Sequence, residues 1–128
     1  MNQEEVIELD RKYHQAQEIE NSLGIIESEI SELDRFAIAL EEIENNKNKK
    51  ILAGLGRGVF IKSELEEKDL FVDVGSGTFL KKSIKETVKT IKNQIGRLKK
   101  VRVEQAAKID SISLEMQELV KQVENEQD

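Results

Sequence analysis

The 128-residue chain is 36% charged and only 4% aromatic, and it contains neither proline nor cysteine. This composition excludes a thick globular core, a disulfide framework, a thiolate nucleophile and a sulfur-ligated metal site, and it favours long uninterrupted helices. The absence of cysteine, an N-terminus without the pattern of a signal peptide, and the lack of an apolar run of about 20 residues predict a cytoplasmic protein with no membrane segment. The net charge of −6 argues against a nucleic-acid surface.

The first segment, residues 1–46, is predicted to form a helix with one apolar seam. Its apolar residues recur at alternating steps of three and four, which is the pattern of a coiled coil. One step breaks the alternation, between Ala16 and Ile19, and predicts a local stammer in the supercoil. The predicted seam consists of Val6, Leu9, Tyr13, Ala16, Ile19, Leu23, Ile26, Ile30, Leu33, Ala37 and Leu40.

Residues 51–82 change in character, because they combine glycines with β-favouring runs. The runs 51–53, 59–65, 70–74 and 78–82 predict four short strands, separated by turns at 54–58, 66–69 and 75–77. Two hairpins with open edges are marginal in water, and their apolar side chains exceed what so small an insert can bury. We therefore expect assembly with other chains through Val59, Phe60, Ile61, Leu70, Phe71, Val72, Val74, Phe79 and Leu80.

The last segment, residues 83–128, predicts a second helix that begins at a capping box, with Ser83 as the cap and Glu86 three residues later. Arg102 and Gln105 are the polar members of its seam, and they either set the register or soften the pairing. The predicted seam consists of Ile84, Val88, Ile91, Ile95, Leu98, Arg102, Gln105, Ile109, Ile112, Met116, Leu119 and Val123.

Two helices of equal length favour pairing with each other. The fold class is therefore predicted as α+β, mainly α: a single domain, 1–128, with a long antiparallel two-helix coiled coil and a four-strand insert that oligomerises. Antiparallel pairing sets the basic run from Lys85 to Arg102 against acidic residues of the first helix. That internal partner argues against a nucleic-acid surface, which is the other interpretation of a basic run. The acidic residues are Glu27, Glu29, Glu32, Asp34, Glu41, Glu42 and Glu44.

No catalytic constellation can be assembled from the sequence. The glycines of 54–58 lack the GK[ST] motif and the following helix of a phosphate-binding loop. His14, the one histidine, has no second ligand at metal spacing, and no serine has a base placed to activate it. We expect no enzyme activity, no cofactor and no metal.

The stretch 51–62 followed by 70–83, and within it Val72-Asp73-Val74-Gly75-Ser76-Gly77, resembles the paired hairpins of α-type prefoldins, archaeal-like in form. The family often has a Val-Pro step in its first strand, where this chain has Ala53-Gly54. The resemblance implies a hexamer of two α-type and four β-type subunits joined through strands into a β-barrel platform. It also implies capture of unfolded proteins and their transfer, without ATP, to a cytosolic group II chaperonin.

The free ends of the two helices are where a coiled coil is least constrained, so apolar residues there are expected to contact unfolded clients. The predicted client-binding residues are Val6, Leu9, Tyr13, Met116, Leu119 and Val123. Several such ends around one cavity would bind weakly but multivalently. The alternative, from another class of function, is a structural scaffold that forms filaments or homo-oligomers through the same strands.

Overall fold

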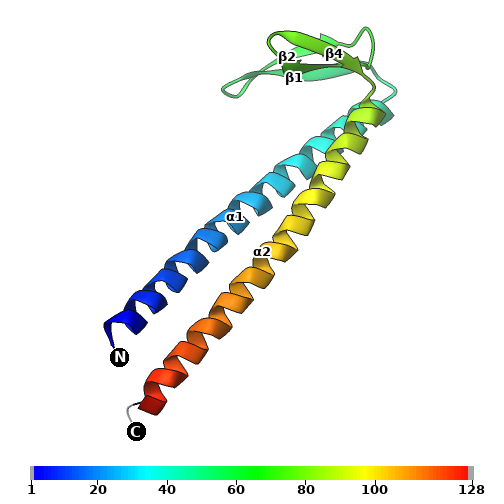
Figure 1. The fold of residues 1–128 in the computed structure, drawn as a ribbon. Helices are drawn as coiled ribbons and strands as arrows, with labels where there is room; N and C mark the ends of the chain where they lie inside the picture. The colour runs from blue at the N-terminus through cyan, green and yellow to red at the C-terminus, as the bar shows by residue number, and fades with distance from the viewer. Residues whose placement is uncertain (1, 127–128) are drawn as a thin grey trace. The chain divides into compact units, whose positions relative to one another are not determined.

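The computed structural model describes residues 2–126 and has the order helix, four strands, helix (Figure 1). This confirms the predicted mainly helical α+β class. The elements are α1 (Gln3–Asn45), β1 (Lys50–Gly56), β2 (Val59–Glu64), β3 (Leu70–Gly75), β4 (Thr78–Lys82) and α2 (Ile84–Glu126). The chain divides into two compact units: a terminal unit, Met1–Glu32 with Ile95–Asp128, and a central unit, Leu33–Gln94.

The terminal unit is a pair of antiparallel helices. Figure 1 shows the blue N-terminal part of α1 beside the orange and red C-terminal part of α2. Lys12 of α1 bonds to Glu115 of α2, Nζ to Oε2, at 2.5 Å, which ties the start of one helix to the end of the other. The buried residues of this unit are Ile30, Ile95, Ile112 and Val123.

The seam of α1 differs from the prediction before Ala16. Val6 and Tyr13 are 49% and 52% exposed, whereas Glu5, Leu9 and Lys12 are half-buried. The four–three alternation therefore continues through Glu5, Leu9 and Lys12 to Ala16, and the predicted stammer is wrong. Lys12 can occupy a seam position because its aliphatic stem packs while its ammonium group reaches Glu115.

The seam of α2 follows the prediction along its whole length. Each of its twelve predicted positions is buried or half-buried, including the polar Arg102 and Gln105. In the central unit the seam is dry, since Ala37, Leu40, Ile84, Val88 and Ile91 are all buried. Burial of this apolar surface is the main term that stabilises the pair.

The start of α2 has the predicted cap. The backbone N–H of Glu86 donates to Ser83 Oγ at 3.1 Å, which satisfies one of the free donors in the first helical turn. At the same end of the central unit's helix pair, α1 finishes on an acidic turn with no basic residue. One of its terminal carbonyls, that of Glu44, accepts from the side chain of Lys68.

The four strands form two separate antiparallel hairpins, β1 with β2 and β3 with β4. Each hairpin closes on two residues with positive φ, Arg57-Gly58 (54° and 77°) and Ser76-Gly77 (51° and 73°). This is the geometry of a type I′ turn, whose twist matches that of the strands.

A bulge precedes each turn, because the pairing register shifts between Gly54 and Gly56 and between Asp73 and Gly75. β1 therefore extends to Gly56, beyond the predicted run of 51–53, and Gly54 pairs with Phe60 instead of belonging to the turn. Gly54 is compatible with a strand because the ring of Phe60, its partner on β2, packs against it.

Candidate functional sites on two apolar surfaces

The hairpins of the central unit expose large apolar side chains on short strands. Phe60 and Phe79 are 63% and 60% exposed and occupy corresponding positions, each two residues after the second turn residue of its hairpin. Of the predicted assembly residues, Val59, Phe60, Ile61, Phe71, Val74, Phe79 and Leu80 are exposed. Leu70 and Val72 are half-buried, because alternate side chains of a strand point to opposite faces.

Two apolar residues of β1, Leu52 and Leu55, are also exposed and were not among the predicted assembly residues. Leu52 lines an open groove of about 560 Å³ together with Lys50, Ile51, Lys62, Ser63 and Glu64. The prediction missed Leu55 because the glycines on both sides of it indicated a turn. The period-two alternation of an extended strand would have indicated Leu52, whereas Leu55 is exposed at the bulge between Gly54 and Gly56.

The loop between the hairpins is held in place by three lysines. Lys68 Nζ donates to the backbone carbonyls of Glu44 (3.2 Å) and Asn46 (2.5 Å) at the end of α1. A cation at a helix C-terminus is favourable, and here it offsets the acidic last turn. The hairpins are thus fixed to the helix pair of their own unit.

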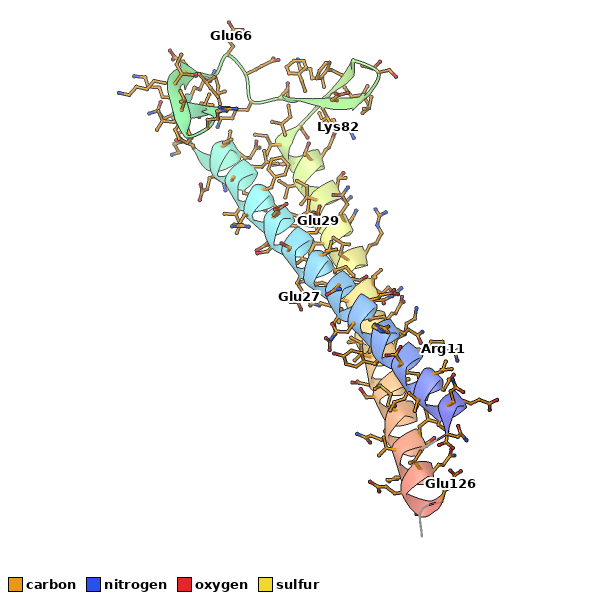
Figure 2. All side chains as sticks on the ribbon, turned by 90° about the vertical axis from the view of Figure 1, so that its left-hand side faces the viewer. Arg11, Glu27, Glu29, Glu66, Lys82 and Glu126 are labelled. Carbon is orange, nitrogen blue, oxygen red and sulfur yellow. The ribbon has the colours of Figure 1, made fainter. Side chains whose placement is uncertain are left out.

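Lys81 of β4 bonds back to the same loop, with its Nζ 3.1 Å from Glu67 Oε1 and 3.6 Å from Asp69 Oδ2. The hydrogen bond with Glu67 is the main cause that raises the pKa of Lys81. Lys49 completes the set, since its backbone carbonyl accepts from the N–H of Leu65 at 2.7 Å. Glu66 lies in this loop and Lys82 at the end of β4 (Figure 2).

The second apolar surface lies in the terminal unit, at the end where Arg11 and Glu126 are found (Figure 2). A groove of about 470 Å³ is lined by Leu9 of α1 and by Met116, Gln117, Val120, Lys121 and Glu124 of α2. The structure thus brings together two predicted client-binding residues, Leu9 and Met116.

The other predicted client-binding residues differ in exposure. Val6 and Tyr13 are exposed, Leu119 is half-buried, and Val123 is buried at 7% exposure. Within residues 2–20 and 108–126, three further exposed apolar residues, Ile7, Leu114 and Val120, were missed because they lie off the seam. A side chain off the seam is not indicated by helical periodicity, so the sequence held no strong signal for them.

Lys12 links the two helices at this end of the pair. Its ammonium contacts Glu115 at 2.5 Å and Glu8 at 3.4 Å, and the hydrogen bond with Glu115 is the first cause that raises its pKa. Glu8 also pairs with Arg11 at 2.5 Å, and that hydrogen bond lowers the pKa of Glu8. The cluster joins both helices at the level of the groove.

One residue of the basic run of α2, Lys92, has an acidic partner on α1. In the central unit Lys92 Nζ lies 3.0 Å from Glu41 Oε1, which is an ion pair between the two helices at the position predicted for opposite charges. Such exposed pairs select the partner and register of a helix more than they stabilise it.

Among residues 2–126, no group of three or more histidine, cysteine, aspartate or glutamate side chains could hold a metal ion. His14 is exposed and lies 3.4 Å from Asp10 on the same helix. Neither helix, within the part of the chain that the structure describes, is apolar enough over sufficient length to cross a membrane.

A model of the family described as "Prefoldin subunit" matches residues 13–128. A search of curated proteins finds no match. Among solved structures, a chain from the cryo-EM structure of filamentous PFD from Methanocaldococcus jannaschii superposes with a TM-score of 0.75 at 16% identity, covering 88% of this chain and 95% of that one. The structural similarity shows the same fold: two long helices with two β-hairpins between them.

Proposed function

The chain belongs to the prefoldin family, and from this premise we propose that it is an α-type subunit of a holdase that captures unfolded proteins without ATP. In this proposal it assembles with β-type subunits as two α plus four β chains in the cytoplasm and passes clients to a group II chaperonin. It has no enzymatic role and uses no cofactor. The prefoldin family consists of non-enzymatic chaperone and scaffold proteins, which supports that part of the proposal.

The observation that carries the proposal is the exposed apolar surface of the two hairpins. Each hairpin has two unpaired strand edges and at least three exposed large apolar side chains. Monomeric proteins rarely leave such surfaces open, and strand edges pair readily with other strands. Assembly through β1–β4 would cover both the edges and the aromatic rings.

Client capture is assigned to the terminal unit because its apolar residues remain exposed while the helices are paired. Met116 suits this role, since a flexible thioether adapts to many partners. Further apolar surface comes from side chains that are exposed or half-buried, namely Val6, Leu9, Tyr13 and Leu119.

Two measurements test the proposal together. The native mass of the chain should shift to that of a closed two-plus-four complex on mixing with a β-type prefoldin, and the complex should suppress aggregation of a chemically denatured model protein. The double variant Phe60→Ser/Phe79→Ser should fail to form the complex. As a matched control, Tyr13→Ser should assemble normally and be impaired in suppression alone.

A second candidate function is a structural scaffold. Filaments are the form named for the archaeal prefoldin whose fold this chain shares. A head-to-tail contact that does not close generates filaments, whereas a closed symmetry gives a finite complex. Electron microscopy of the purified chain separates the two: long filaments indifferent to a β-type partner would favour the scaffold and contradict the closed hexamer.

A further inference from the structure

The groove at the end of the terminal unit is open while the two helices remain paired. Leu9, Met116 and Val120 supply its apolar lining, and Glu124 and Lys121 supply its charged members. Val6 and Tyr13 lie seven residues apart on one face of α1, each directly after a seam position, and both are exposed. Val120 holds the same place after the seam residue Leu119 on α2. Apolar surface is thus available on this flank without unwinding of either helix.

This end of the terminal unit is strongly acidic. Residues 2–20 and 108–126 contain eleven acidic and four basic side chains, for a net charge of −7. Two of the four basic residues, Arg11 and Lys12, are engaged by Glu8, and Lys12 also by Glu115. The surface around the groove therefore presents mainly carboxylates.

The helix pair of the central unit does not share this charge. Residues 33–45 and 84–94 contain five acidic and four basic side chains, for a net charge of −1. The helices of the central unit therefore pair through an apolar seam without an excess of negative charge around it. Because like charges repel one another, the acidic end lowers the stability of its own helix pair and is not explained by pairing.

On these grounds we propose that the groove selects unfolded segments in which apolar residues alternate with lysine or arginine, and that it disfavours apolar segments rich in aspartate or glutamate. This inference rests on the proposed holdase function and specifies its substrate class. The apolar residues of the segment fill the space between Leu9, Met116 and Val120, while its cations meet Glu124 and the surrounding carboxylates. Complementary charge raises the rate of encounter and rejects partners of the wrong sign.

The test uses the assembled complex and three fluorescein-labelled peptides with the same leucine, valine and phenylalanine content. Their polar positions are filled with lysine, glutamine or glutamate. In low salt we expect the lysine peptide to bind at least about ten-fold more tightly than the glutamate peptide, with the glutamine peptide between them. The difference should shrink as salt rises, because the Debye length falls to about 8 Å at 0.15 M.

Variants of the complex test whether the preference for the lysine peptide arises at the groove. Glu118→Gln/Glu124→Gln removes the groove carboxylate Glu124 and the exposed carboxylate of Glu118, two residues before Val120. This variant should weaken binding of the lysine peptide by several-fold and leave binding of the glutamine peptide unchanged. Glu27→Gln/Glu29→Gln removes the same charge from α1 away from the groove (Figure 2) and should have little effect on either peptide. Met116→Ser/Val120→Ser should weaken all three peptides.

The outcomes are distinguishable. Equal binding of the lysine and glutamate peptides, in a complex that still suppresses aggregation, would overturn the selectivity and leave the holdase proposal standing. If the lysine peptide binds the Met116→Ser/Val120→Ser variant as tightly as the wild type, binding depends on acidic charge alone and not on the groove. That result would also overturn the inference. If none of the three peptides binds and the complex also fails to suppress aggregation, the proposed function itself is contradicted.

Discussion

The two units use the same helix pair differently. In the central unit, Ala37, Leu40, Ile84, Val88 and Ile91 form a dry seam beneath two hairpins. In the terminal unit the seam includes four polar residues, Glu5, Lys12, Arg102 and Gln105, and most of its apolar members are half-buried. Both mid-helix glycines, Gly24 and Gly96, also belong to the terminal unit.

The difference shows how one heptad pattern can serve two purposes. A dry seam holds the strands of the central unit to a rigid base. A seam with polar members and helix glycines is less stable, and a surface that contacts varied partners benefits from that lower stability. Substitutions in the two units test this contrast.

The sharpest comparison uses one substitution in both units. Leu40→Ala in the buried central seam should lower the free energy of unfolding by about 2–5 kcal/mol, because it removes packed atoms and leaves a cavity. Leu119→Ala, at a half-buried terminal position, should cost about half as much. Urea unfolding of the two variants measures both values, and equal costs would contradict the contrast.

The cap of α2 contributes to the central unit. Ser83→Ala removes the acceptor for the Glu86 N–H and should cost about 1 kcal/mol. Ser83→Asp, which retains an acceptor, serves as the control and should be close to wild type. Thermal unfolding compares the three proteins, and a loss of stability in the aspartate variant as large as in the alanine variant would argue against the capping role.

The glycines allow the terminal unit to be stiffened. A Cβ at Gly24 or Gly96 would meet nothing within 4 Å, so Gly24→Ala and Gly96→Ala should each stabilise the helix by up to about 1 kcal/mol. Hydrogen exchange should slow in residues 2–32 and 95–126 and stay unchanged in 33–94. As a contrast in the central unit, Gly77→Ala should destabilise, because Gly77 has a φ of 73°. Slower exchange in both units would show that the units are not independent.

The smallest effect concerns Lys12. Its pKa is raised in the folded state, so its pairing with Glu115 contributes stability fully below the ordinary lysine pKa of about 10.4 and loses it as the pH rises through the raised value. The variant Lys12→Met keeps the seam position and cannot titrate. The stability of the wild type relative to this variant should therefore fall above about pH 10.4. A difference that stays constant from pH 7 to 11 would exclude the linkage.

Periodicity predicted the fold well where the seam is apolar. The whole seam of α2 and that of α1 from Ala16 to Leu40 lie where the spacing placed them. The error before Ala16 arose because a count of apolar residues selects Val6 and Tyr13 over Lys12. Only the structure shows that a lysine with a carboxylate in reach can take a seam position.

The hairpins illustrate a different limit. Glycine indicated turns at 54–58 and 75–77, and both turns exist, but only two residues of each form the turn proper. The rest extend the strands through a bulge. Glycine permits positive φ without requiring a turn, and pairing with Phe60 determined the conformation of Gly54. The terminal groove was predicted in part, through Leu9 and Met116, while the flank residue Val120 depends on how the two helices pack.

The contact between the loop that joins the hairpins and the end of α1 is formed by one side chain, that of Lys68, and two backbone carbonyls. Lys68 recognises Glu44 and Asn46 through their backbone carbonyls, which every amino acid possesses. Substitutions at positions 44 and 46 leave these acceptors in place, whereas few residues at position 68 could reach them. In a library of all single substitutions, position 68 should therefore tolerate few replacements and its two partners many, although the three residues form one contact.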